Sequence, residues 1–232
     1  SLNIQDNLLT TLDLSGNPIL WSLSANNNDL TGLDLTNNTN LRNIYCDNNQ
    51  MTSIISPNNT NLSYLQCNNN QLTVLNIMNS PSLSGITCGN NQLTQLEMPN
   101  SLGLINVYAN DNQLTAFNAA NHPVLRSLAL SNNLLTSIDL SDNPSLEDFL
   151  IEDNLLTTLD VSNNPNLTRL VCSRNNISGM LDVTRNPNLQ TLYCFFNQLL
   201  RLQLPNTDIN LMYCHSNLHG LQICVPDTTL AL

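Results

Sequence analysis

The chain has no lysine and is poor in charged residues, glycine and aromatic residues. Its 232 residues include six arginines, 17 acidic residues, seven glycines and one tryptophan, and the formal net charge is -11. Phosphate binding needs a basic stripe, so nucleic acid is not an expected partner. An anionic membrane surface is disfavoured for the same reason. No run of about 20 apolar residues occurs, so direct membrane insertion is not expected.

Asparagine, in contrast, is abundant and recurs at a nearly fixed step. The spacing is 21 residues eight times, then 22, then 20, at Asn7, Asn28, Asn49, Asn70, Asn91, Asn112, Asn133, Asn154, Asn175, Asn197 and Asn217. A polar residue held at one phase of an apolar repeat indicates a solenoid, because every turn meets the same backbone problem at the same place.

One repeat, from Leu62 to Ser82, shows how each turn is built. Leu65 and Cys67 alternate with outward residues, which is the period of a half-buried strand. Asn70 follows where the chain turns, and its inward amide would satisfy buried backbone groups and bridge to the asparagines of neighbouring turns. Return segments such as 33–35 (Leu-Asp-Leu) alternate again, so we expect a second short ladder of strands on the opposite side.

The full frame is L-x-x-L-x-[C/A/L/I]-x-x-N-x-L-T-x-L-D-L-S-x-N-P, clearest in residues 62–81 and 146–165. It resembles the leucine-rich repeats of bacterial surface proteins, in particular internalin J-like proteins and secreted Bacteroidetes proteins. The resemblance covers residues 1–223. It implies an α/β-type but β-rich leucine-rich repeat solenoid, a right-handed curved superhelix of about eleven turns. Its concave face would be a parallel β-sheet, and its convex face would hold turns and short 3₁₀ or β segments.

The organisation expected from this pattern is one repeat domain, residues 1–223, followed by a closing segment, residues 224–232, of a longer protein. The chain opens inside a repeat, so a signal peptide or N-terminal cap would lie outside it. An uncapped solenoid end exposes core. We therefore expect a monomer unless the uncapped ends associate.

Six of the seven cysteines share one phase of the repeat: Cys46, Cys67, Cys88, Cys172, Cys194 and Cys214. Other turns place alanine, leucine or isoleucine there, so the position requires a small apolar side chain. Parallel side chains suit neither zinc nor disulfide geometry. We predict buried free thiols, no metal site and no cofactor. Cys224 falls outside the phase, and its pairing stays open.

Aromatic residues gather on the outward strand positions of the repeat. These positions hold all five tyrosines, together with Phe195 and His215, and the candidate ligand-binding residues are Tyr45, Tyr64, Tyr108, Tyr193, Phe195, Tyr213 and His215. Exposed tyrosine suits a sugar or a protein contact, although strand propensity and cross-strand stacking also favour it there. Amides surround the N-terminal aromatics, and acids followed by arginines surround the later ones. Both a protein and a polysaccharide therefore remain candidate ligands.

Two other files of polar residues repeat along the chain. Threonine recurs at Thr10, Thr31, Thr52, Thr73, Thr94, Thr115, Thr136 and Thr157, and such a file resembles ice-binding solenoids. Its neighbouring file is irregular, which favours hydroxyls that satisfy backbone groups. An aspartate file, Asp13, Asp34, Asp139, Asp160 and Asp182, is interrupted by uncharged residues, which excludes a continuous rank of calcium sites and leaves an isolated site open.

No catalytic motif is present, so the chain is not expected to be an enzyme. The resemblance implies an extracellular or cell-surface recognition or adhesion module that uses its concave strand face. Two alternatives stay open: a passive spacer within a surface protein, and ice binding through the threonine file.

Overall fold

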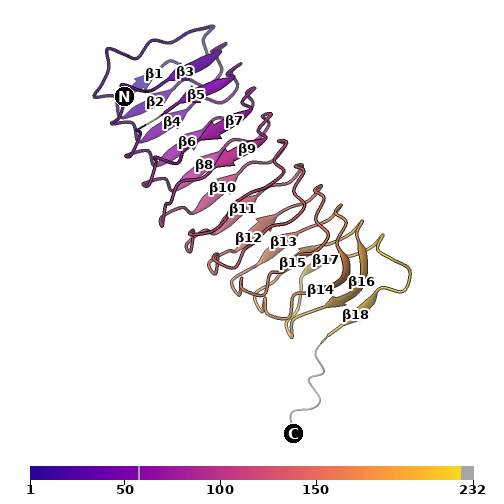
Figure 1. The fold of residues 1–232 in the computed structure, drawn as a ribbon. Helices are drawn as coiled ribbons and strands as arrows, with labels where there is room; N and C mark the ends of the chain where they lie inside the picture. Colours follow the sequence, from indigo (N-terminus) through magenta and orange to yellow (C-terminus); the bar gives the residue numbers. More distant parts are fainter. Residues whose placement is uncertain (57, 226–232) are drawn as a thin grey trace. The chain divides into compact units, whose positions relative to one another are not determined.

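The computed structural model describes residues 1–56 and 58–225. These residues fall into two compact units: unit 1 ends at Phe117, and unit 2 begins at Asn118. Each unit repeats one turn: a short strand, the repeated asparagine, and a return segment (Figure 1). The described residues form strands, turns and bends and contain no helical segment. The part of the chain described here thus has no helix with the length and apolar character needed to cross a bilayer.

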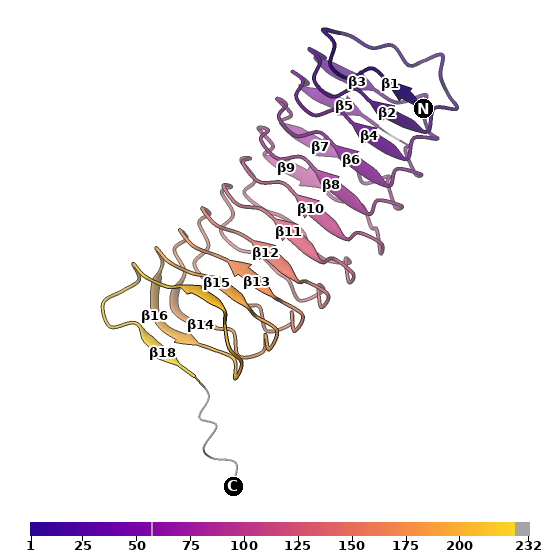
Figure 2. The ribbon, with the colours of Figure 1, turned by 180° about the vertical axis from the view of Figure 1, so that it is seen from behind.

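Unit 1 has a main parallel sheet and two small sheets on its other side (Figures 1 and 2). The main strands are β1 (Leu2–Asn3), β2 (Ser22–Ser24), β4 (Asn43–Tyr45), β6 (Tyr64–Gln66), β8 (Gly85–Thr87) and β10 (Asn106–Tyr108). The small sheets pair β3 (Gly32–Asp34) with β5 (Ser53–Ile55) and β7 (Val74–Asn76) with β9 (Gln95–Glu97). The expected second ladder is therefore present, in short pieces.

Unit 2 repeats this plan. Its main strands are β11 (Ser127–Ala129), β12 (Asp148–Leu150), β13 (Arg169–Val171), β15 (Thr191–Tyr193) and β17 (Leu211–Tyr213). A second sheet joins β14 (Ser178–Asp182), β16 (Gln198–Gln203) and β18 (Gln222–Cys224). The expected domain boundary at residue 223 falls within β18, which pairs with β16, and the rest of the closing segment from residue 226 lies outside the described residues.

The irregular spacing of the last repeats is absorbed away from the main sheet. Arg169 pairs with Thr191, and Thr191 pairs with Leu211, so the main register is kept across steps of different length. On the opposite side, the register between β14 and β16 shifts after Gly179: Gly179 pairs with Leu199 and Met180 with Arg201, so Leu200 of β16 is left out of the pairing. Gly179 has a φ of 72°, a conformation that costs glycine little. The strand face is therefore preserved while the opposite side carries the irregularity.

The core of each turn lies between the main strand and the return segment. In the turn that begins at Leu62, the inward side chains are at most 1% exposed: Leu62, Leu65, Cys67, Leu72, Leu75 and Ile77. Burial of such side chains contributes roughly 1.5–3 kcal/mol each, before the entropy of ordering the chain is subtracted. The period read from the sequence thus assigns the inward and outward sides correctly.

The repeated asparagine satisfies backbone groups at the end of each strand. Asn49 accepts a hydrogen bond through Oδ1 from the N–H of Leu30 at 3.0 Å. Its Nδ2 donates to the carbonyls of Ala25, Cys46 and Asp47 at 3.0–3.2 Å. The asparagine side chain thus connects its own turn to the backbone of the preceding turn. The sequence suggested that these asparagines would bond one another directly. In the structure, all four side-chain hydrogen bonds of Asn49 go to backbone groups instead.

The cysteine prediction is confirmed for most of the file. Cys46, Cys67, Cys88, Cys172 and Cys194 are buried free thiols, and Cys214 is partly buried. Burial raises the pKa of the Cys88 and Cys194 thiols to about 12, so both are neutral at ordinary pH. These cysteines fill space in the core.

Candidate functional site

The outward side chains of the main strands form one surface in each unit, here called the strand face. In unit 1, the rings of Tyr45 and Tyr64 lie 5.8 Å apart. The Tyr64 ring extends over Gly85, where an added Cβ would come within 2.8 Å of it. Partial burial raises the Tyr64 pKa. Tyr108 makes no ring contact with the other two tyrosines among the described residues.

The polar groups of the strand face of unit 1 bind mainly one another. The Asp47 carboxylate accepts from the Gln66 amide and from the N–H of Asn68. The Asn68 side chain in turn donates to Thr87 Oγ1 at 2.9 Å and accepts from the N–H of Gly89 at 2.8 Å. This amide and carboxylate network joins three turns and occupies its own donors and acceptors.

In unit 2, the predicted aromatic residues meet in one cluster. Tyr193 and Tyr213 lie 4.9 Å apart, and Phe195 stacks on His215 at 4.9 Å with an angle of 12° between the rings. Tyr193 also lies 6.4 Å from Phe195. Such offset and edge contacts are each worth about 0.5–1.5 kcal/mol. The structure therefore brings together four of the seven predicted residues.

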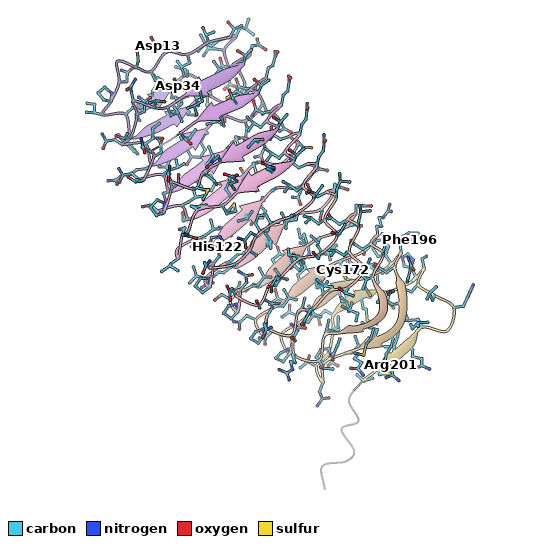
Figure 3. All side chains as sticks on the ribbon, viewed as in Figure 1. Asp13, Asp34, His122, Cys172, Phe196 and Arg201 are labelled. Carbon is cyan, nitrogen blue, oxygen red and sulfur yellow. The ribbon has the colours of Figure 1, made fainter. Side chains whose placement is uncertain are left out.

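A fifth aromatic residue, Phe196, completes this cluster and was not among the predicted site residues. Its ring lies 5.7 Å from Phe195 and 5.6 Å from His215, and its side chain is 49% exposed (Figure 3). Phe196 directly precedes Asn197, one of the repeated asparagines, here called the ladder asparagines. Most turns place asparagine or aspartate at the position before the ladder asparagine. A phenylalanine at that position was the signal available in the sequence.

One arginine, Arg174, belongs to this cluster, and further charged residues border it. The Arg174 guanidinium lies 5.4 Å from the centre of the Phe196 ring and 6.0 Å from that of Phe195, within the range of a cation–π contact. Its Nε is 3.7 Å from a Glu152 oxygen. Further along the face, Arg169 lies 3.9 Å from Asp148. We call the set Arg174, Tyr193, Phe195, Phe196, Tyr213 and His215 the aromatic cluster.

Two of the bordering carboxyls have shifted pKa values. Burial raises the pKa of Asp148, and the charge of Arg169 partly offsets the shift. Burial also raises the pKa of Glu152; the charge of Asp153 adds to the effect and that of Arg174 opposes it. Both shifts express the cost of placing a charge on a surface that is partly closed to water.

The threonine and aspartate files have structural roles. Thr52 Oγ1 donates to the carbonyl of Thr31, and Thr94 Oγ1 donates to that of Thr73, both at 3.3 Å. These hydroxyls bond backbone groups of the preceding turn, as predicted.

In the aspartate file, each carboxylate accepts from the N–H two residues on, for example Ser141 to Asp139 at 2.9 Å. Asn76 and Asn118 make the same bond in other turns, so the position requires an acceptor and no charge. Among residues 1–56 and 58–225, no group of histidine, cysteine and acidic residues is arranged to hold a metal ion.

A shallow hollow of about 540 Å³ lies on unit 1 beside the start of β2 and β4. Its lining consists of Ile19, Trp21, Asn40, Arg42 and Asn61. Asn40 and Asn61 use their amide groups to bond the carbonyls of Pro18 and Thr39 in the preceding turns. Trp21, the single tryptophan of the chain, forms part of this lining and is 51% exposed.

Comparison with known proteins identifies the class. No family model matches the chain, and no curated protein matches it. Among solved structures, the functional domain of InlJ from Listeria monocytogenes, which includes a cysteine ladder, is 31% identical with a TM-score of 0.86. The match covers 94% of this chain and 48% of that one, so the chain spans about half the length of that domain.

Two other structures show the same fold. YopM, a leucine-rich effector protein from Yersinia pestis, is 27% identical with a TM-score of 0.76, over 97% of this chain and 68% of that one. A chain of the Toll–Spatzle complex of Drosophila is 26% identical with a TM-score of 0.65, over 84% of this chain and 29% of that one. The chain is therefore a leucine-rich repeat protein. Its similarity to InlJ and InlP of Listeria monocytogenes makes it an internalin-like one, and the comparisons indicate no catalytic family.

Proposed function

We propose that the chain is an extracellular recognition or adhesion module that binds a protein partner through the strand face of unit 2. The observation that carries the proposal is the aromatic cluster, in which tyrosine, phenylalanine and arginine side chains meet at a partly exposed surface. Aromatic residues and arginine are the side chains most enriched in the energetic centres of protein interfaces.

Exposure within the cluster supports a role beyond packing. Tyr213 is 47% exposed and Phe196 is 49% exposed, and Leu211 beside them is 40% exposed. Apolar side chains grouped at a surface mark an interaction site more often than the same residues scattered singly. The bordering acids and arginines would form the polar rim of such an interface.

A protein is favoured over a polysaccharide as the ligand. Apart from the stacked pair Phe195 and His215, the aromatic rings of the cluster contact one another at tilted and edge angles, and they border ion pairs between arginines and acidic residues. The amide-rich surface that a sugar would need lies on unit 1, where the Gln66 and Asn68 amides already bond the Asp47 carboxylate, the Thr87 hydroxyl and the backbone N–H of Gly89. The Toll–Spatzle complex gives one case of a related fold in a protein complex.

The test is a binding screen of the 232-residue chain against arrayed purified extracellular proteins, with a glycan array run in parallel. We expect protein ligands to bind, and the double variant Tyr193→Ala, Tyr213→Ala to reduce their affinity at least tenfold. The matched control is Tyr45→Ala, Tyr108→Ala, which removes two tyrosines from the strand face of unit 1. Binding that depends on the unit 1 pair contradicts the site, and binding to neither array favours the spacer alternative.

A further inference from the structure

One backbone position in every turn is left-handed. It is the residue before the ladder asparagine, with φ between 50° and 60°, and it comprises Asp6, Asn27, Asn48, Asn69, Asn90, Asp111, Asn132, Asp153, Arg174, Phe196 and Ser216. Asparagine and aspartate fill it in every turn up to Asp153. The departures are confined to the last three described positions, all within unit 2.

Asparagine and aspartate are the non-glycine residues that enter this conformation most readily, because their short polar side chains bond nearby groups. In unit 1 they also stack. The Asn48 amide donates to Asn27 Oδ1 at 2.7 Å, and the Asn69 amide donates to Asn48 Oδ1 at 2.8 Å. Phe196 can make no such bond, and a bulky residue at a φ of 50° is an outlier.

The side chain at this disfavoured position is directed to the surface. Phe196 is 49% exposed, and the guanidinium of Arg174 lies against it at 5.4 Å. Arg174 approaches Glu152 through Nε at 3.7 Å. Its two terminal nitrogens have no hydrogen-bond acceptor among residues 1–56 and 58–225. Phe196 and Arg174 thus place an apolar ring beside a guanidinium whose two terminal nitrogens can donate hydrogen bonds to a ligand.

We infer that Arg174 and Phe196 form the specificity-determining corner of the binding face, and that it takes a protein segment with a carboxylate beside an apolar side chain. A guanidinium with two free terminal nitrogens matches a carboxylate in a bidentate pair. The Phe196 ring would cover the adjoining apolar group. The inference rests on the proposed function, because it assigns partner chemistry to the same face.

A measurement of thermal stability distinguishes a role of Phe196 in ligand binding from a role in packing of the fold. Phe196→Asn restores the residue that suits the left-handed backbone, at the cost of the ring contacts. If the phenylalanine is retained for binding, relief of the backbone strain should at least offset the lost ring contacts, and the variant should unfold at a Tm equal to or above that of wild type. The control is Ser216→Asn, which makes the same restoration in the next turn. A fall in Tm for Phe196→Asn would assign the ring to folding and overturn the inference.

A binding measurement tests the partner chemistry. The probe is a phage-displayed library of random 12-residue peptides, selected on the wild-type 232-residue chain. We expect enriched peptides to carry aspartate or glutamate next to a large apolar residue. A synthetic peptide of that sequence should bind Phe196→Asn and Arg174→Asn at least tenfold more weakly than wild type, and Ser216→Asn within twofold of it.

The outcomes distinguish this corner from the face as a whole. If the peptide loses affinity for Tyr193→Ala, Tyr213→Ala but not for Phe196→Asn, the proposed function stands and this inference fails. Peptides enriched without acidic residues also overturn it. If a uronic acid oligosaccharide binds through Arg174 and no peptide does, the ligand is an acidic glycan and both proposals fail.

Discussion

The two units carry the same repeat in the same register, yet their strand faces differ in what the outward side chains bond to. In unit 1, Asp47, Gln66, Asn68 and Thr87 bond one another across three turns. In the last two turns of unit 2, the equivalent positions hold aromatic rings, and an ion pair between Glu152 and Arg174 borders them. The first surface is closed by its own hydrogen bonds, while the second leaves apolar area and a guanidinium exposed. A solenoid can therefore keep its architecture constant and change one face locally.

The left-handed position shows the same division. Unit 1 uses it for a file of amides that bond from turn to turn, whereas the end of unit 2 uses it for Arg174, Phe196 and Ser216. The first choice stabilises the backbone conformation, and the second gives up that stabilisation. Residues in disfavoured backbone conformations gather where function requires them.

The largest expected effect comes from the element that both units share. Asn49→Ala in unit 1 and Asn175→Ala in unit 2 each remove one side chain that bonds four backbone groups. Leaving buried backbone groups without partners costs about 1–3 kcal/mol each, so we expect roughly 3 kcal/mol or more from either variant. Urea unfolding would measure both. Strongly unequal losses would show that the units differ in architecture as well as in surface.

A smaller effect should distinguish the closed face of unit 1. Gly85→Ala places a Cβ within 2.8 Å of the Tyr64 ring, which must move away from this turn. The cost should be about 1–2 kcal/mol in urea unfolding. In Tyr64→Ala the same change should cost much less, so a double-mutant cycle isolates the contact. Gly103→Ala is the control, because no atom lies within 4 Å of the added Cβ. Equal costs in the two backgrounds would contradict the close packing of Tyr64 on this turn.

Much of this comparison could be predicted from the sequence, because a fixed period assigns every residue to an inward or outward position. The period placed Tyr193, Phe195 and Tyr213 on one face, and the structure brings their rings together. It could not show that Tyr64 is covered through Gly85, since that depends on ring orientation. It also did not identify Phe196, because a left-handed φ is not visible in a pattern of apolar and polar residues.

The smallest expected effects are opposite pH dependences in the two units. Glu152 in unit 2 has a folded pKa raised by burial, so its contribution to stability is present below its unfolded pKa and lost as pH rises through the folded value. Asp34 in unit 1 has a folded pKa lowered by its bonds from Thr36. Its contribution is present above the unfolded pKa and lost as pH falls through the folded value.

Removing each charge should therefore change stability in opposite directions with pH. Glu152→Gln should gain a few tenths of a kcal/mol relative to wild type at pH 7, after discounting for solvent screening, and should lose that gain by pH 3. Asp34→Asn should be less stable than wild type at pH 7 and approach it at pH 3. Thermal unfolding of the three proteins between pH 3 and 7 measures both differences. If the two difference curves have the same slope, the acids of the unit 2 face are no more desolvated than the turn-capping acids of unit 1, and the contrast between the faces would then rest on the aromatic cluster alone.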